Sequence, residues 1–153
     1  MRKIVICIST LLFSASVFSV SAAAEIEDPV AVRKALMQAV AASAGTSSAM
    51  LRGNREYDMA VAKAAIATFH ASAKALSSFF PENSHTGGTT AAPTIWKDPE
   101  AFGSAVAKFR AAAATAVDLA GHDGPADLEA FRQAVTPVLG NCSSCHQSFR
   151  VQN

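Results

Sequence analysis

Cysteine is scarce in this sequence, with three in 153 residues. Cys7 lies in an N-terminal apolar run, so the rest of the chain holds only Cys142 and Cys145. A disulfide between residues three apart closes too short a loop to stabilise a fold appreciably. This scarcity excludes a small scaffold braced by disulfides. Half of the residues are apolar, which is enough for one domain to bury a core of its own.

Charged residues are also few, at 16% of the chain, and neither sign dominates. Proteins that bind nucleic acid need a basic patch, and nothing in the sequence indicates one, so we expect no nucleic-acid partner. The sequence shows no paired carboxylates, no nucleophile beside a base and no phosphate-binding glycine loop. We therefore expect that the protein is not an enzyme.

The chain has one long apolar run, from Ile4 to Val20, which follows Arg2 and Lys3 and precedes small residues at 21–24. This layout is typical of a secretory signal peptide. The run is interrupted by serines and is shorter than the roughly 20 residues that span a bilayer. An uncleaved membrane anchor is therefore disfavoured, and no second candidate span follows.

Cleavage is expected after Ala23 or Ala24, which gives a signal peptide over residues 1–24 and a mature domain over residues 25–153. Loss of Arg2 and Lys3 reduces the 13 Lys and Arg to 11, against 12 Asp and Glu. Cys7 leaves with the signal peptide. The mature protein is thus expected outside the cytoplasm, in a compartment that permits cysteine oxidation.

No segment shows the β-branched alternation that predicts strands, whereas apolar residues recur every three or four positions. We expect an all-α fold, with helices over about 28–52, 56–80, 98–121 and 127–150. Four helices with short connections pack most simply as an antiparallel bundle. Pro137 is predicted to bend the last helix or to split it in two. Ile95 and Trp96 are expected to fix the far end of a polar loop over residues 81–97.

The fourth predicted helix contains the run Cys142-Ser143-Ser144-Cys145-His146. In this CxxCH pattern the cysteines lie at i and i+3 of one helical face, so each sulfur can bond a vinyl arm of the same porphyrin. The adjacent imidazole is a good axial ligand for haem iron. The motif therefore predicts one covalently attached haem c, with Cys142 and Cys145 as anchors and His146 as the iron ligand.

Other uses of the same cysteines are disfavoured. A thioredoxin-like redox pair needs a βαβ context, and a zinc site needs two more ligands at suitable spacing. His70, His85 and His122 lie in different segments without such spacing. A structural helical protein with an oxidised cysteine pair remains as a third hypothesis, behind the two haem functions considered below.

The mature chain resembles the class II c-type cytochromes, which comprise cytochrome c′ and its low-spin relatives of the cytochrome c-556 type. The resemblance rests on the C-terminal CxxCH followed by Phe149 and Arg150, and on Arg33 with Leu36-Met37. It also rests on Phe80-Pro81 and on the run Ala92-Pro93-Thr94-Ile95-Trp96. A haem motif near the C-terminus distinguishes this family from ordinary class I cytochromes c.

The resemblance implies a four-helix bundle with His146 as the proximal ligand and Cys142 and Cys145 as thioether anchors. It implies that the first helix covers the opposite face of the haem. Such proteins are periplasmic and many are homodimers, and they exchange electrons with redox partner proteins or bind NO or CO.

Met37 falls where this family places its distal residue, and two outcomes stay open. A thioether can ligate haem iron, or it can form an apolar wall. In proteins like cytochrome c′ the distal residue covers a five-coordinate iron that takes up NO or CO. In the c-556 branch a methionine is the sixth ligand and the protein carries electrons. Met50 and Met59 are lesser candidates.

Two arginines and four aromatic residues complete the candidate site. Arg33 lies four residues before Met37, so its guanidinium is expected either to pair with a haem propionate or to lie in solvent. Arg150 follows His146 by four residues, where its charge disfavours a positive charge on the imidazole. The candidates for lining the haem pocket are Phe80, Trp96, Phe131 and Phe149, of which Phe80 and Phe149 match the family pattern.

Overall fold

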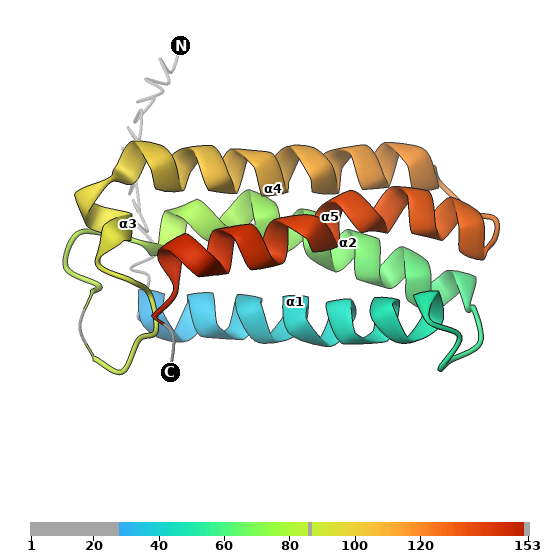
Figure 1. Cartoon of the computed structure of the whole chain (residues 1–153), viewed down its shortest axis with the longest axis horizontal. Coiled ribbons are helices and arrows are strands. Elements are labelled where there is room, and N and C mark those ends of the chain that lie inside the picture. Colours follow the sequence, from blue (N-terminus) through green and yellow to red (C-terminus); the bar gives the residue numbers. More distant parts are fainter. Residues whose placement is uncertain (1–27, 86, 152–153) are drawn as a thin grey trace, which may run out of the picture.

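The computed structural model describes residues 28–85 and 87–151, so the predicted signal peptide lies outside the described residues. Four long helices run side by side in alternating directions (Figure 1). They are α1 (Pro29–Leu51), α2 (Met59–Ala75), α4 (Pro99–Ala120) and α5 (Leu128–Phe149). A 3-10 turn, η1 (Leu76–Phe79), continues α2, and a short helix, α3 (Thr94–Lys97), precedes α4. The predicted all-α antiparallel four-helix bundle is confirmed.

Each long helix begins at an aspartate whose carboxylate accepts hydrogen bonds from the first turn. Asp28 accepts from Val30 N at 2.9 Å, and the equivalent caps of α2, α4 and α5 are Asp58, Asp98 and Asp127. An aspartate cap satisfies amide groups that the helix itself leaves unpaired. Prolines follow Asp28 and Asp98, as the sequence predicts for the first position of a helix.

The second helix is shorter than its prediction over residues 56–80. Asp58 has an extended backbone and caps Val61 N, so α2 starts at Met59 instead of Glu56. At the other end the α-helix stops at Ala75 and tightens into η1 ahead of Pro81. A 3-10 turn is common where a helix ends, and proline disfavours helical backbone in the residue before it.

Pro137 lies inside α5, which continues unbroken from Leu128 to Phe149. The alternative of two separate helices is therefore wrong. Proline removes the amide that would bond to Gln133 O, but both Pro137 and Gln133 are exposed. Water can satisfy the freed carbonyl on this side of the helix, so the break in the hydrogen-bond ladder does not end the helix.

The loop before α4 is fixed at its far end, as predicted. Ile95 is buried, and the indole Nε1 of Trp96 donates to Pro81 O at 3.0 Å. The loop also pairs with the end of α5 through an antiparallel bridge between Ala91 and Arg150. One end of the bundle therefore carries this loop together with the start of α1 and the end of α5 (Figure 1).

Two apolar clusters fill the interior. The larger one lies among the four long helices and includes the fully buried Phe69, Phe131 and Val135. The smaller one lies at the loop end and consists of Leu76, Ile95, Phe102 and Val106, with Phe80, Trp96 and Phe149 packed against it. Met37 packs against both clusters. The closest packing between helices joins α1 with α2, α2 with α4, and α4 with α5, whereas α1 and α5 make few close contacts.

Within residues 28–85 and 87–151, none of the helices has the length and apolar character needed to cross a membrane.

Candidate functional site

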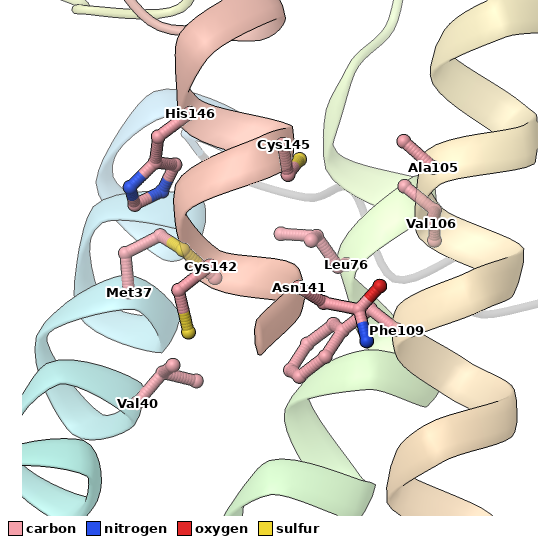
Figure 2. A pocket seen from close by; sticks show the side chains of 10 residues that line it. All are labelled: Met37, Val40, Leu76, Ala105, Val106, Phe109, Asn141, Cys142, Cys145 and His146. Atoms are coloured by element: carbon pink, nitrogen blue, oxygen red, sulfur yellow. The ribbon is translucent and has the colours of Figure 1, made fainter. Parts of the chain in front are cut away.

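An apolar cleft lies where the C-terminal half of α5 faces α1, η1 and α4. Cys142, Cys145 and His146 line it together, as their positions on one face of α5 predict. The free space between its walls is about 420 Å³, part of which is open to solvent. The other lining residues are Met37, Val40, Leu76, Ala105, Val106, Phe109 and Asn141 (Figure 2).

Cys142 and Cys145 are half-buried free thiols. Burial raises the pKa of both thiols above the ordinary value, and the proximity of Cys142 raises that of Cys145 further. Both sulfurs are therefore protonated near neutral pH. They are held on an ordered helix face and remain available for bond formation.

The imidazole of His146 is half-buried in the same cleft. Burial lowers its pKa below the ordinary value, and the positive charge of Arg150 lowers it further. Both effects favour the neutral imidazole, which is the form that binds a metal ion. Arg150 thus acts on the electrostatics of His146, consistent with its position one turn further along the chain.

Met37 lines the same cleft as His146. Figure 2 shows Met37 extending from α1 and His146 from α5 into the same space. Among the methionines of the described residues, Met37 alone lines the cleft. Met50 is 1% exposed in the larger cluster, and Met59 is 46% exposed at the start of α2. Both are therefore unsuited to the role of an iron ligand.

Of the two environments expected for Arg33, a haem propionate or solvent, the structure rules out solvent, because the side chain is buried. It is 4% exposed, and Nη1 and Nη2 donate hydrogen bonds to Phe79 O, to both oxygens of Ser84 and to Thr89 Oγ1. The guanidinium also lies over the rings of Phe80 and Trp96, with centroid distances of 4.8 and 5.7 Å. Phe79 ends η1, and Ser84 and Thr89 lie in a loop whose conformation the sequence does not reveal.

The four aromatic candidates separate into three environments. Phe131 is fully buried in the larger cluster beside Tyr57, so it belongs to the core and not to the cleft. Phe80 and Trp96 pack beside Arg33. Phe149 lines a second hollow between α4 and α5 that shares Ala105, Asn141 and Cys145 with the cleft. Of the four candidates, only Phe149 therefore lines a hollow together with one of the cysteines, Cys145.

Several cleft residues escaped prediction. Val106 and Phe109 show the core periodicity of α4, and nothing in that pattern separates a cleft wall from ordinary core. Ala105 lies beside that stripe, and its small size leaves space in front of α5. Asn141 precedes the first cysteine, and its Nδ2 donates to Pro137 O at 2.8 Å. Its position next to the motif is the one feature of the sequence that could have indicated that Asn141 lines the cleft.

The zinc alternative has no structural support. His85 lies on the loop with its ring against Trp96, and His122 lies in the exposed turn after α4, beside Asp123. His70 lies on α2. In the part of the chain that the structure describes, no three His, Cys, Asp or Glu side chains gather to bind a metal ion.

The residues present fit a haem c. Two thiols separated by one helical turn and a neutral imidazole provide two sulfur anchors and an axial nitrogen ligand. The remaining lining is almost entirely apolar, as the body of a porphyrin ring requires. Ala105 on α4 has a small side chain, which leaves space between α4 and α5.

Comparisons with known proteins agree with this assignment. The sequence model of the family described as Cytochrome C′ matches residues 28–150. Cytochrome c′ of Rhodopseudomonas palustris is 39% identical over 127 residues, which cover 82% of this chain and 83% of that protein. Cytochrome c-556 of Agrobacterium tumefaciens is 34% identical over 120 residues, which cover 78% and 94%.

A solved structure of cytochrome c′ from Rhodopseudomonas palustris superposes with a TM-score of 0.73 and 35% sequence identity, over 82% of this chain and 98% of that one. The predicted resemblance to class II c-type cytochromes is thereby confirmed. Members of this family carry a covalently attached haem c, and the run from Cys142 to His146 has the form of their attachment motif. The chain belongs to the cytochrome c′ family.

Proposed function

We propose that the protein carries single electrons between redox partner proteins. Cys142 and Cys145 would anchor the haem through thioether bonds, and His146 and Met37 would hold its iron. The haem, when bound, supplies an iron that exchanges one electron. The observation that carries this proposal is that a methionine and a histidine from different helices line one apolar cleft, with their side chains in the same space.

The chain's own side chains suit electron transfer. Apolar residues of α1, η1 and α4 line the cleft, and burial of a haem against apolar side chains is one lever by which proteins set its reduction potential. The depressed pKa of His146 keeps its imidazole neutral and ready to ligate. A thioether as the second ligand favours the reduced iron and raises the potential.

Neighbouring residues have supporting roles in this proposal. Arg150 lowers the pKa of His146, and Phe149 packs beside Cys145. The ring of Phe80 packs against the guanidinium of Arg33. Contact of Arg33 with a haem propionate is confined to Nε, because Nη1 and Nη2 already donate two hydrogen bonds each.

A second candidate function is binding of NO or CO at an iron that Met37 covers without ligating. The apolar wall around Met37 favours it, since a small uncharged gas needs no polar partner in such a cleft. A nitric oxide complex has been described for a cytochrome c′ variant from Alcaligenes xylosoxidans, which at 24% identity to this chain supports a common fold only. The gas-binding candidate therefore depends on the cleft of this chain.

The cellular setting follows from the N-terminal sequence. The signal peptide over residues 1–24 directs the chain to the periplasm, where the haem is attached and redox partners are met. The protein turns over no substrate of its own. A homodimer, which the family resemblance implies, would use surface on α1 and α2.

The absorption spectrum of the purified, dithionite-reduced protein tests the proposal. A sharp, split visible band is expected, because six-coordinate low-spin iron gives it. A broad band with a high-spin Soret peak, together with ready CO binding, would establish the gas-binding candidate instead. A colourless protein from a host with haem-attachment machinery would leave only the structural hypothesis. His146→Ala should retain the attached haem and change its spectrum.

A further inference from the structure

Arg33 fastens the loop between η1 and α3 to the first helix. Its Nη1 donates to Phe79 O at 3.1 Å and Ser84 Oγ at 2.9 Å, and its Nη2 donates to Ser84 O at 2.6 Å and Thr89 Oγ1 at 2.8 Å. Burying a cation costs several kcal/mol unless hydrogen bonds compensate for the lost water. These four charge-assisted bonds and the two aromatic rings provide that compensation. The loop is thus tied to α1 by one buried side chain.

The same loop is tied to α5 further along the chain. Ala92 N donates to Phe149 O at 3.0 Å, and Val151 N donates to Thr90 O at 2.8 Å. Thr94 Oγ1 adds a bond to Ser148 O at 2.8 Å. The three partners, Ser148 and Phe149 on α5 and Val151 just after it, lie within five residues of His146. We call the described residues 84–85 and 87–94 the clasp.

The clasp therefore joins the helix that carries Met37 to the helix that carries His146 (Figure 1). Arg33 lies one helical turn before Met37, and the bonds to α5 begin just after His146. Direct packing between α1 and α5 is sparse compared with the packing of the neighbouring helix pairs. The separation of these two helices at the cleft consequently depends on the clasp more than on contacts between the helices themselves.

We propose that the clasp sets how closely Met37 approaches the iron bound by His146, and that Arg33 is its positioning residue. This inference rests on the proposed haem site. Releasing the clasp frees the first turns of α1 to move away from α5, so Met37 covers the iron less well. External ligands then bind more readily, whether Met37 is a sixth ligand or only an apolar cover.

The test compares the reduced holo-protein with Arg33→Met, Arg33→Lys and Thr89→Val. Thr89→Val removes one acceptor from the loop and leaves α1 unchanged, so it serves if Arg33→Met does not fold. Arg132→Met is the matched control. Arg132 donates to Leu51 O at 3.2 Å and so also joins α5 to α1, but at the end of α1 away from the clasp.

Two readouts are needed, CO affinity by titration and amide hydrogen exchange by mass spectrometry. In Arg33→Met we expect CO affinity to rise about fivefold or more, the scale of a typical coupling between sites. Amides of residues 30–40 and of the clasp should exchange faster. Thr89→Val should raise CO affinity and amide exchange by less than Arg33→Met does. Arg33→Lys, which keeps the charge, should give values between those of Arg33→Met and the wild type. Arg132→Met should leave CO affinity unchanged.

Unchanged CO affinity in both Arg33→Met and Thr89→Val would overturn the inference. So would an equal rise in Arg132→Met, since that would indicate general loosening of the bundle. If the wild-type protein carries no haem, the proposed function fails instead. Hydrogen exchange then still shows whether Arg33 ties the clasp to α1, so the two failures are distinguishable.

Discussion

Met37 and Met50 are both on α1, yet only Met37 lines the cleft, while Met50 is buried in the larger cluster. Replacing either with leucine nearly conserves apolar volume, so each change should cost less than about 1.5 kcal/mol of stability. Met37→Leu removes the thioether and should convert low-spin iron to a high-spin form that binds CO. Met50→Leu should leave the absorption spectrum as it is. Spectra and CO titrations of the two reduced variants check this, and identical behaviour would contradict the role of Met37.

Tyr57, the chain's only tyrosine, joins the start of α2 to the turn before α5 by donating its hydroxyl hydrogen to Pro125 O. Burial raises the pKa of Tyr57, and the charges of Asp127 and Asp58 raise it further. The folded state therefore favours the neutral phenol. The resulting stability is fully present below about pH 10, the ordinary tyrosine pKa, and is lost as the pH rises above it.

Tyr57→Phe should lower the free energy of unfolding near neutral pH by about 0.5–1.5 kcal/mol, because one hydrogen bond is lost. Above about pH 10 the variant should lose less stability with rising pH than the wild type, because it has no phenol to ionise. Urea denaturation at a series of pH values measures both effects. Parallel pH profiles for the two proteins would show that Tyr57 contributes nothing to the alkaline loss.

Among the elements, α5 combines an internal proline with the haem-attachment motif. Pro137→Ala restores the amide donor for Gln133 O and a residue of high helix propensity. We expect the free energy of unfolding to rise by about 1–2 kcal/mol, less than the full propensity difference because proline also restricts the unfolded chain. Gln133→Ala, on the same exposed part of α5, is the control and should change stability by no more than about 0.5 kcal/mol. A loss of stability in Pro137→Ala would mean that packing requires the proline.

The helices were predictable and the loop contacts were not. Apolar spacing, the Asp-Pro starts and Gly121 place α1, α4 and α5 near their observed bounds, because each signal is local in the sequence. The start of α2 was misplaced, since Glu56, Tyr57 and Asp58 all precede a helical pattern and only the cap geometry distinguishes them. The bonds from Arg33 to Ser84 and Thr89 span about 50 residues, so no local pattern could reveal them.

For the molecule as a whole, both apolar clusters contribute walls to the cleft, but Phe131 and Phe102 lie in different clusters and at different distances from the haem-attachment end of α5. Phe131 belongs to the larger cluster, whereas Phe102 belongs to the smaller one and packs edge-on against Phe80 and Phe149, with centroids at 4.8 and 5.3 Å. Both Phe131→Leu and Phe102→Leu should lower stability by about 1 kcal/mol or more. Only Phe102→Leu should also alter the haem spectrum. Denaturant midpoints measure stability and visible spectra report on the haem. A spectral change in Phe131→Leu would contradict the prediction that only Phe102 affects the haem.

The close packing of neighbouring helices also bears on how the chain reaches its fold. Helices α1 and α2 form one helical hairpin, and α4 and α5 form another. Contacts between sequence neighbours give low contact order, which places helical bundles among proteins that fold in microseconds to milliseconds. Met37 belongs to the first hairpin, and Cys142, Cys145 and His146 belong to the second. The cleft is thus the seam between two locally folding units, and it becomes complete when they dock.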